Sequence, residues 1–217
     1  MIDARPDHPN LFVVDHPLIN HKMTHMRDRE QGRRTFRALA TQIAGLMVYE
    51  ATRTFCTEPV EIETPLEAMT GVRLSGATTI APVLRAGLGM STGVLEMLPT
   101  ARVAHLGLRR DEDTLEPEVY LEKIPHDLAA GPVLLLDPML ATGGSAVAAA
   151  SILRDAGARD LRMLCLVAVP EGVRAMREAH PDVPVFAAAL DRQLDERGFI
   201  RPGLGDAGDR LFGTEEL

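Results

Sequence analysis

Short apolar runs alternate along the chain with segments in which apolar residues recur every three or four positions. The apolar runs predict strands at residues 79–84, 101–108, 132–137, 161–169 and 183–190. They are almost continuously apolar, which is typical of strands covered on both faces. The three-and-four spacing predicts helices at residues 35–52, through Val94 and Leu95, at 145–158 and at 171–180. Strands that alternate with helices predict an α/β fold with a mostly parallel sheet flanked by helices.

Two segments break this pattern. Residues 109–125, RRDEDTLEPEVYLEKIP, are polar and acidic without periodicity, which predicts a loop of a length often found in mobile lids. Residues 198–217 contain many glycines, but Ile200, Leu204, Leu211 and Phe212 favour docking. We therefore expect this C-terminal segment to fold back onto the sheet as a cap.

Composition narrows the function classes. The 217 residues are 46% apolar and only 4% aromatic, with a formal net charge of −8. An acidic chain is poorly suited to sequence-independent nucleic-acid binding, which needs cations that neutralise phosphates. No apolar run reaches membrane-spanning length, and residues 1–10 contain no apolar signal core. We expect a cytoplasmic protein without a membrane or nucleic-acid partner, in which Cys165, inside an apolar run, is a buried small hydrophobe.

The stretch VLLLDPMLATGGSAV, residues 133–147, carries the strongest chemical signal. Asp137 ends a predicted strand, and ligands of open α/β sheets bind beyond such strand ends. Gly143 and Gly144 are predicted to turn the backbone with positive φ, before a helix whose first N–H groups are unpaired. Together with Thr142 and Ser145 they would form a cradle for one phosphate, while Asp137 accepts from hydroxyls of the same ligand. A turn with a helix N-cap is the simpler alternative, and the spacing is not that of a Walker A loop.

The segment DPMLATGGS resembles the phosphoribosyl-diphosphate (PRPP) signature of type I phosphoribosyltransferases. Most of that superfamily carries two adjacent acids at the strand end, whereas Pro138 follows Asp137 here, and this version is similar to that of uracil phosphoribosyltransferases. The segments HPLINHKMTHMRD, PVLRAGLGM, RRDEDTLEP, VAVPEG and GFIRPGLGDAGDRLFGT resemble the same family in the same order. The resemblance covers nearly the whole chain except about the first seven residues and the stretch TPLEAMTGVRLSG.

The resemblance implies a type I phosphoribosyltransferase core with a small C-terminal hood. Residues 1–217 would form a single domain in which about 187–217 are the base-binding hood. The implied reaction is pyrimidine salvage: uracil and PRPP give UMP and diphosphate.

The same comparison assigns the site residues by class. The catalytic residues would be Asp137, Arg110 and Asp206. The PRPP ligands would be Arg85, Arg110, Asp137, Pro138, Met139, Leu140, Ala141, Thr142, Gly143, Gly144, Ser145 and Asp206. The uracil contacts would be Ile200, Gly205, Asp206 and Ala207.

Several roles stay open at this stage. Arg85 could form an ion pair with a neighbouring carboxylate instead of binding diphosphate, and the peptide beside it could be strained or cis. Asp137 could accept from a ribose hydroxyl or stabilise positive charge on the sugar, and Asp206 could be a base or only a ligand. Arg110 would be carried on the lid, to which Lys123 and Tyr120 could also belong.

No histidine shows metal-ligand spacing, so we expect no metal held by protein side chains, and Mg²⁺ bound mainly through PRPP and water. The resemblance also implies a homodimer or higher homo-oligomer and, in some members, a GTP effector. One alternative is a transferase of the same fold that acts on another base. A second is a non-catalytic RNA-binding regulator, which would need a basic face that the net charge disfavours.

Overall fold

The computed structural model describes residues 5–110 and 117–214, with only the backbone described for Arg110 and Pro117. Its main element is a nine-stranded sheet with the order β1-β11-β10-β8-β4-β6-β7, in which β5 pairs with β4 and β9 with β10. The strands are β1 (Leu11–Val13), β4 (Thr79–Leu84), β5 (Arg102–Val103), β6 (His105–Arg110), β7 (Pro117–Lys123), β8 (Val133–Leu136), β9 (Met139–Leu140), β10 (Leu161–Ala168) and β11 (Val185–Leu190). Each pairing is parallel except that of β6 with β7, so the prediction of a mostly parallel sheet is confirmed.

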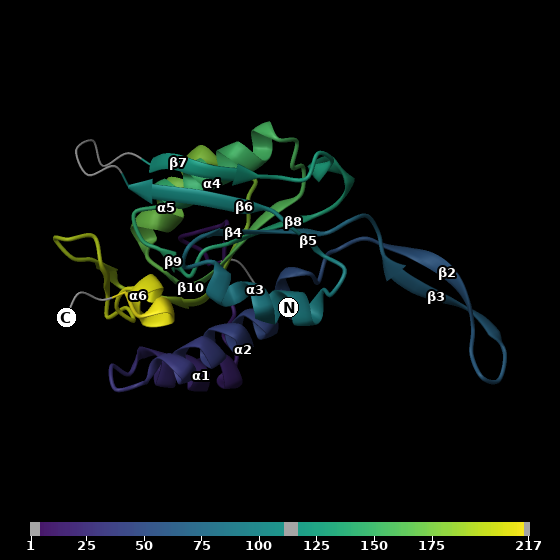
Figure 1. Cartoon of the computed structure of the whole chain (residues 1–217), viewed down its shortest axis with the longest axis horizontal. Helices are drawn as coiled ribbons and strands as arrows, with labels where there is room; N and C mark the ends of the chain where they lie inside the picture. The colour runs from purple at the N-terminus through teal and green to yellow at the C-terminus, as the bar shows by residue number, and fades with distance from the viewer. Residues whose placement is uncertain (1–4, 111–116, 215–217) are drawn as a thin grey trace.

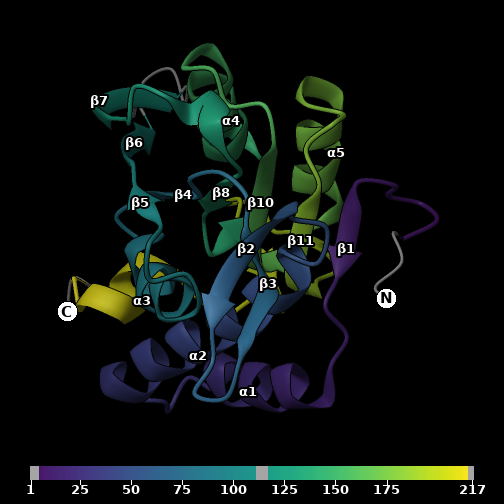
Figure 2. The ribbon, with the colours of Figure 1, turned by 90° about the vertical axis from the view of Figure 1, so that its right-hand side faces the viewer.

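Helices cover both faces of this sheet (Figure 1). They are α1 (Pro17–Arg27), α2 (Arg33–Ala51), α3 (Leu88–Met97), α4 (Gly144–Asp155) and α5 (Pro170–Ala179), with a short 3₁₀ turn at Leu128–Ala130. The helices α1, α2 and α3 lie on one side, and α4 and α5 on the other (Figure 2). Leu134 and Leu136 of β8 pack into the first core and Leu135 into the second. Burial on both faces explains why the central strands are continuously apolar.

The prediction of a loop at residues 109–125 is wrong for the second half of this segment. Residues Pro117–Lys123 form β7, which pairs antiparallel with β6 at the edge of the sheet. The sequence did not predict this strand because its residues do not alternate between a buried and an exposed face. Val119 and Tyr120, which point to opposite faces, are 44% and 50% exposed. The remaining residues of the segment, 111–116, lie outside the described part of the chain.

An antiparallel hairpin, residues 57–74, projects from the body of the protein, and we call it the arm (Figures 1 and 2). It consists of β2 (Thr57–Glu63) and β3 (Ala68–Leu74), which pair along their full length. Nothing in the sequence analysis predicted the arm, since its apolar residues do not build a core. They stay exposed on both strands and at the tip: Ile62, Leu66, Met69, Val72 and Leu74.

After β11 ends at Leu190, the chain leaves the sheet and forms the hood segment, residues 191–214. This segment contains β12 (Gln193–Leu194), β13 (Ile200–Arg201) and α6 (Ala207–Phe212). Its buried side chains join the core formed with α1 and α2: Ile200, Leu204, Ala207 and Leu211. The expected docking of the C-terminal segment is therefore confirmed.

The two cysteines differ in their exposure to solvent. Cys165 is fully buried, as predicted, while Cys56 is exposed, and both are free thiols. None of the helices in the described ranges combines the length and apolar character needed to cross a bilayer.

Candidate active site

The order of the strands locates a crevice at the carboxyl ends of β4 and β8. These strands are neighbours, but the chain continues from β4 toward β6 on one side and from β8 toward β10 on the other. Such a reversal of strand order opens a ligand site in open α/β sheets. Arg85 directly follows β4, and Asp137 directly follows β8. The structure therefore brings these two predicted residues to the same edge of the sheet.

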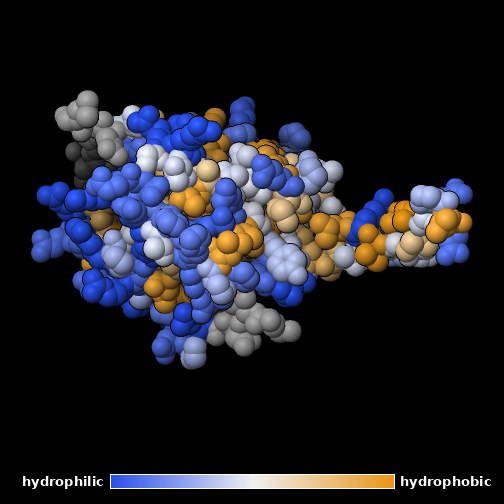
Figure 3. Space-filling model, turned by 90° about the horizontal axis from the view of Figure 1, so that it is seen from below, coloured by the Kyte–Doolittle hydropathy of each residue, from blue (hydrophilic) through white to orange (hydrophobic). Residues whose placement is uncertain are grey.

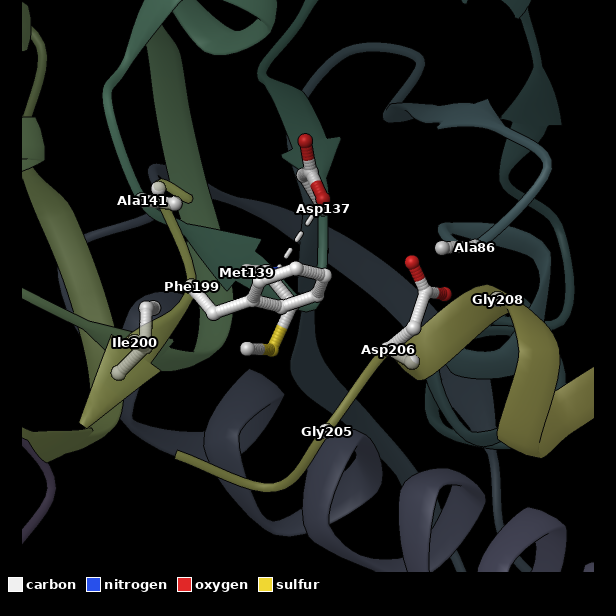
Figure 4. A pocket seen from close by; sticks show the side chains of 11 residues that line it. Ala86, Asp137, Met139, Ala141, Phe199, Ile200, Gly205, Asp206 and Gly208 are labelled. Carbon is white, nitrogen blue, oxygen red and sulfur yellow. Dashed lines mark hydrogen bonds between the residues drawn. The ribbon is translucent and has the colours of Figure 1, made fainter. Parts of the chain in front are cut away.

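A cavity of about 250 Å³ lies at this edge. Its lining comes from the segments after β4 and β8 and from the hood: Ala86, Asp137, Met139, Ala141, Gly198, Phe199, Ile200, Gly205, Asp206, Ala207 and Gly208. Figure 4 shows the Asp137 carboxyl group on one side of the cavity and that of Asp206 on another. Residues predicted for PRPP and residues predicted for uracil therefore share one cavity.

The segment from Asp137 to Ser145 turns from β8 into α4. Gly143 has a left-handed φ of +90° and is the N-cap of α4, as predicted. A Cβ at Gly143 would lie only 2.7 Å from the Cβ of Ala175 in α5. The prediction of positive φ for Gly144 is wrong, because Gly144 is already the first residue of the helix. The first N–H groups of this 12-residue helix face the turn that carries Thr142 and Ser145.

Pro138 and Leu140 support this turn from behind. The carbonyl of Pro138 accepts hydrogen bonds from the N–H groups of Leu166 and Val167, both at 3.0 Å. The carbonyl of Leu140 accepts from Val169 at 3.1 Å, and the Leu140 side chain is fully buried. These contacts fix the turn against β10.

Asp137 carries a carboxyl group whose pKa is raised by burial. Removal from water raises the pKa of Asp137 to about 7, and the N–H of Met139, which donates to Oδ1 at 3.3 Å, opposes the shift. The pKa of the nearby Cys165 thiol is also raised, mainly by burial and further by Asp137. Perturbed groups of this kind in a cavity indicate a functional site.

Arg85 is exposed beside the cavity and follows a cis peptide bond between Leu84 and Arg85. Its guanidinium lies 5.9 Å from the centre of the Phe212 ring, and Nη2 donates to Thr214 Oγ1 at 3.4 Å. Among the residues that the structure describes, no carboxylate forms an ion pair with Arg85. Arg110 ends β6, two strands from β8, but its side chain lies outside the described part of the structure.

Asp206 has a structural contact that the sequence did not suggest. It is the N-cap of α6, and its Oδ1 accepts from the N–H of Asp209 at 2.9 Å. The side chain is exposed at the cavity, and its neighbours Gly205 and Ala207, which also line the cavity, carry no side chain beyond a methyl group.

Four residues of the cavity had not been assigned individually as ligands: Ala86, Gly198, Phe199 and Gly208. Each lies directly beside a predicted residue or one position further along the same motif. Phe199 carried a usable signal in the sequence, because it is an aromatic residue within a glycine-rich segment of a chain that is only 4% aromatic. In the structure its side chain is 45% exposed.

The chain is similar to known proteins over nearly its whole length. The family model for uracil phosphoribosyltransferase matches residues 13–214. The chain is 52% identical over 207 residues to the uracil phosphoribosyltransferase of Listeria innocua serovar 6a, covering 95% of this chain and 99% of the relative. It is 54% identical over 206 residues to the protein of that name from Symbiobacterium thermophilum, covering 94% and 99%.

Solved structures show the same fold. The AQ2163 protein from Aquifex aeolicus superposes with a TM-score of 0.91 at 33% identity, covering 95% of this chain and 100% of that one. A hypoxanthine-guanine phosphoribosyltransferase from Bacillus anthracis superposes with a TM-score of 0.52 at 8% identity, covering 73% and 80%, and shows the fold alone. The family match and the relatives extend over nearly all of the chain, and we conclude that it belongs to the uracil phosphoribosyltransferase family.

Proposed function

We propose that the protein transfers the phosphoribosyl group of PRPP to N1 of uracil, giving UMP and diphosphate. The observation that carries the proposal is the single cavity in which the segment after β8 meets the glycine-rich wall of the hood. One side offers the carboxyl group of Asp137 and Ala141, which precedes the turn into α4, and the other offers a segment of backbone with few large side chains. These suit a sugar phosphate and a planar base, respectively.

The 5-phosphate would bind at the turn of residues 141–145. The N–H groups at the start of α4 and the hydroxyls of Thr142 and Ser145 are suitable donors, and the helix dipole favours an anion there. The packing of Gly143 against Ala175 supports this proposal, because a glycine with positive φ lets the turn lie close against α5 while it leads into α4.

The diphosphate would be bound by Arg85 and Arg110. A guanidinium presents a planar fork of donors that matches phosphate oxygens. The contacts of Arg85 with Phe212 and Thr214 support this role, since they hold the side chain beside the cavity without neutralising its charge.

Asp137 would accept hydrogen bonds from a ribose hydroxyl and stabilise the positive charge that develops on the sugar ring. Uracil N1 attacks C1 of the ribose from the side opposite the diphosphate, the bond from C1 to the diphosphate oxygen breaks, and the configuration at C1 inverts. The N1 proton leaves to solvent or to Asp206. The protein would act mainly by orienting the two substrates and by stabilising charge.

Uracil would bind against Ile200, Gly205, Asp206 and Ala207. Its two carbonyl oxygens and its N3–H can be read by backbone N–H and C=O groups where side chains do not interfere. This mode of recognition distinguishes uracil from cytosine, because cytosine reverses the donor and acceptor at positions 4 and 3.

Mg²⁺ would be bound mainly through PRPP and water. The described residues contain no group of three or more His, Cys, Asp or Glu side chains that could hold a metal ion. Diphosphate oxygens are suitable ligands for this hard cation, and the ion would reduce the negative charge of the leaving group.

We also propose that the protein works as a homodimer or higher oligomer in the cytoplasm. The exposed apolar side chains of the arm support self-association, since isolated domains rarely expose such a group of residues. Two free thiols suit a reducing compartment. GTP activation, which the resemblance implies for some members, is testable by adding GTP to the assay below.

The test is diphosphate release from PRPP with uracil, cytosine and hypoxanthine as separate acceptors and UMP identified as the product. We expect turnover with uracil, and a kcat/KM for cytosine lower on the order of 10⁴-fold. Turnover with another base in place of uracil would favour a transferase of the same fold that acts on that base. No turnover with any base, together with RNA binding, would favour the regulator.

A further inference from the structure

A largely buried ion pair lies directly behind the base-binding wall of the cavity. Arg27 is the last residue of α1, and Asp191 is the first residue after β11. The two side chains meet in a bidentate contact, with Nη2 to Oδ1 at 2.7 Å and Nη1 to Oδ2 at 2.8 Å. Their exposed fractions are 23% for Arg27 and 6% for Asp191. The pair therefore joins two elements that are far apart in the sequence.

The same pair binds both polar groups of one backbone residue in the hood. Arg27 Nη1 donates to the carbonyl of Gly203 at 2.7 Å, and Asp191 Oδ2 accepts from the N–H of Gly203 at 2.8 Å. Gly203 has a left-handed φ of +66°, and a Cβ there would lie 2.1 Å from the carbonyl oxygen of Ile200. The backbone therefore turns tightly at Gly203, and the ion pair, which lies outside the cavity, holds this turn in place.

Gly203 lies between two residues that line the cavity, Ile200 and Gly205. Neither Arg27 nor Asp191 lines the cavity itself. The contact of the pair with the cavity therefore runs through the backbone of residues 200–205.

We propose that Arg27 and Asp191 are positioning residues that set the backbone of the base site, and thereby the affinity for uracil. This inference rests on the proposed function. Base recognition through backbone groups requires those groups to be fixed before the ligand arrives, because each displaced donor or acceptor loses its hydrogen bond. A bidentate pair with little exposure provides such fixation, since its geometry is planar and its partners cannot exchange easily with water.

A role in fastening the hood alone is less well supported. The hood is already held by other contacts: Arg210 donates to the carbonyls of Met26 and Leu204, both at 2.8 Å, and Leu211 is buried in the core. A simple fastener would lower stability without selecting between the two substrates. A positioning pair would change the kinetics of uracil and leave those of PRPP nearly unchanged.

The test uses Arg27→Lys, which keeps the charge but loses the fork, and Asp191→Asn, which keeps the shape but loses the charge. The matched control is the pair of Glu50, in the last turn of α2, and Arg53, just after that helix, which also meet at 2.7 Å but lie outside the cavity, changed to Glu50→Gln and Arg53→Lys. We expect KM for uracil to rise between about 10- and 100-fold in the first two variants, with KM for PRPP changed less than about twofold. The control variants should match the wild type in both constants.

Hydrogen exchange of the amides in residues 198–208 gives a readout independent of turnover. It should become faster in both positioning variants while exchange in β8 stays unchanged. Failure of the proposed function would show as a wild-type protein without uracil turnover, whereas the exchange result would still test the pair. The inference is overturned if folded variants keep the KM for uracil and the exchange of residues 198–208, or if the KM values for uracil and PRPP rise together.

Discussion

The carboxyl group of Asp137 changes charge near neutral pH, because burial raises its pKa to about 7. In the unfolded chain the group has its ordinary value of 3.8. Between these two values the folded protein binds more protons than the unfolded chain, so its stability falls as pH rises through this window. The cause is the cost of keeping a charged carboxylate away from water.

Asp137→Asn should therefore remove a pH-dependent loss of stability. Relative to the wild type, the free energy of unfolding of the variant should increase by on the order of 2 to 3 kcal/mol between pH 5 and pH 8. Urea unfolding at a series of pH values, without ligands, measures the difference. Parallel stability curves for the two proteins would show that Asp137 does not titrate in this window.

The same group should control the use of PRPP. If the carboxylate form accepts from the ribose hydroxyl, kcat/KM for PRPP rises with pH and levels off above an apparent pKa of about 7. The Asn variant provides the matched control, since the phosphates of PRPP titrate equally in both assays. It should be weaker overall and should lack the Asp137 step, and an identical profile would remove the ionised carboxylate from PRPP binding.

A comparison of alanine substitutions at Gly143 and Gly157 would separate the cost of backbone strain from the cost of close packing. Both have positive φ, +90° and +99°, but a Cβ at Gly143 would meet Ala175 at 2.7 Å whereas one at Gly157 would meet nothing within 4 Å. Gly157→Ala should cost about 1 to 2 kcal/mol in unfolding free energy and leave PRPP binding intact. Gly143→Ala should cost more and also weaken PRPP binding by calorimetry. Equal costs and normal PRPP titration in both variants would show that the turn tolerates the added methyl group.

Among the elements, those with a simple burial pattern were predictable from the sequence. The strand β8 and its neighbours read as apolar runs because both of their faces are covered, and Arg85 and Asp137 could be located because strand ends define the crevice. The edge strand β7 has exposed side chains on both faces, so neither alternation nor a continuous run identified it. Helix α1 buries Ile19, Met23 and Met26 at helical spacing, but the polar residues between them weakened that pattern.

The contacts that close the site could not be predicted in the same way. The pairing of Arg27 with Asp191 joins residues through tertiary geometry, across 164 positions of the chain. A sequence pattern records which residues are near one another along the chain. It gives no register between a helix end and a distant hood segment.

Docking of the hood should depend strongly on Arg210. Its guanidinium donates to the carbonyls of Met26 and Leu204 at 2.8 Å and of Asp28 at 2.7 Å, and lies 4.3 Å from the centre of the Phe36 ring. Arg210→Ala leaves three carbonyls without this donor and should lower the free energy of unfolding by about 2 to 4 kcal/mol. The exposed Arg192, also in the hood segment, provides the control as Arg192→Ala, expected within about 0.5 kcal/mol of the wild type. Similar urea midpoints for both variants would contradict this role.

At the scale of the whole molecule, the arm is the feature that the single chain leaves unexplained. Figure 3 shows it extending from the body with apolar surface along it. Val72 is 74% exposed and Leu66 95% exposed, although a hairpin without packing on either face is only marginally stable in water. Under the proposed self-association, a second copy of the chain would bury these side chains.

Val72→Asp should therefore weaken self-association without unfolding the protein. Burying a charge in place of a valine costs more than the lost apolar contact, so the dissociation constant between copies should rise at least about tenfold. Sedimentation equilibrium over a range of protein concentrations measures this constant, with circular dichroism to confirm the fold. Val119→Asp on β7, away from the arm in Figure 1, is the control, because Val119 is also exposed, at 44%. If the Val72 variant associates as the wild type does, or if the wild type is a monomer at every concentration, the arm does not mediate self-association and its apolar surface needs another occupant.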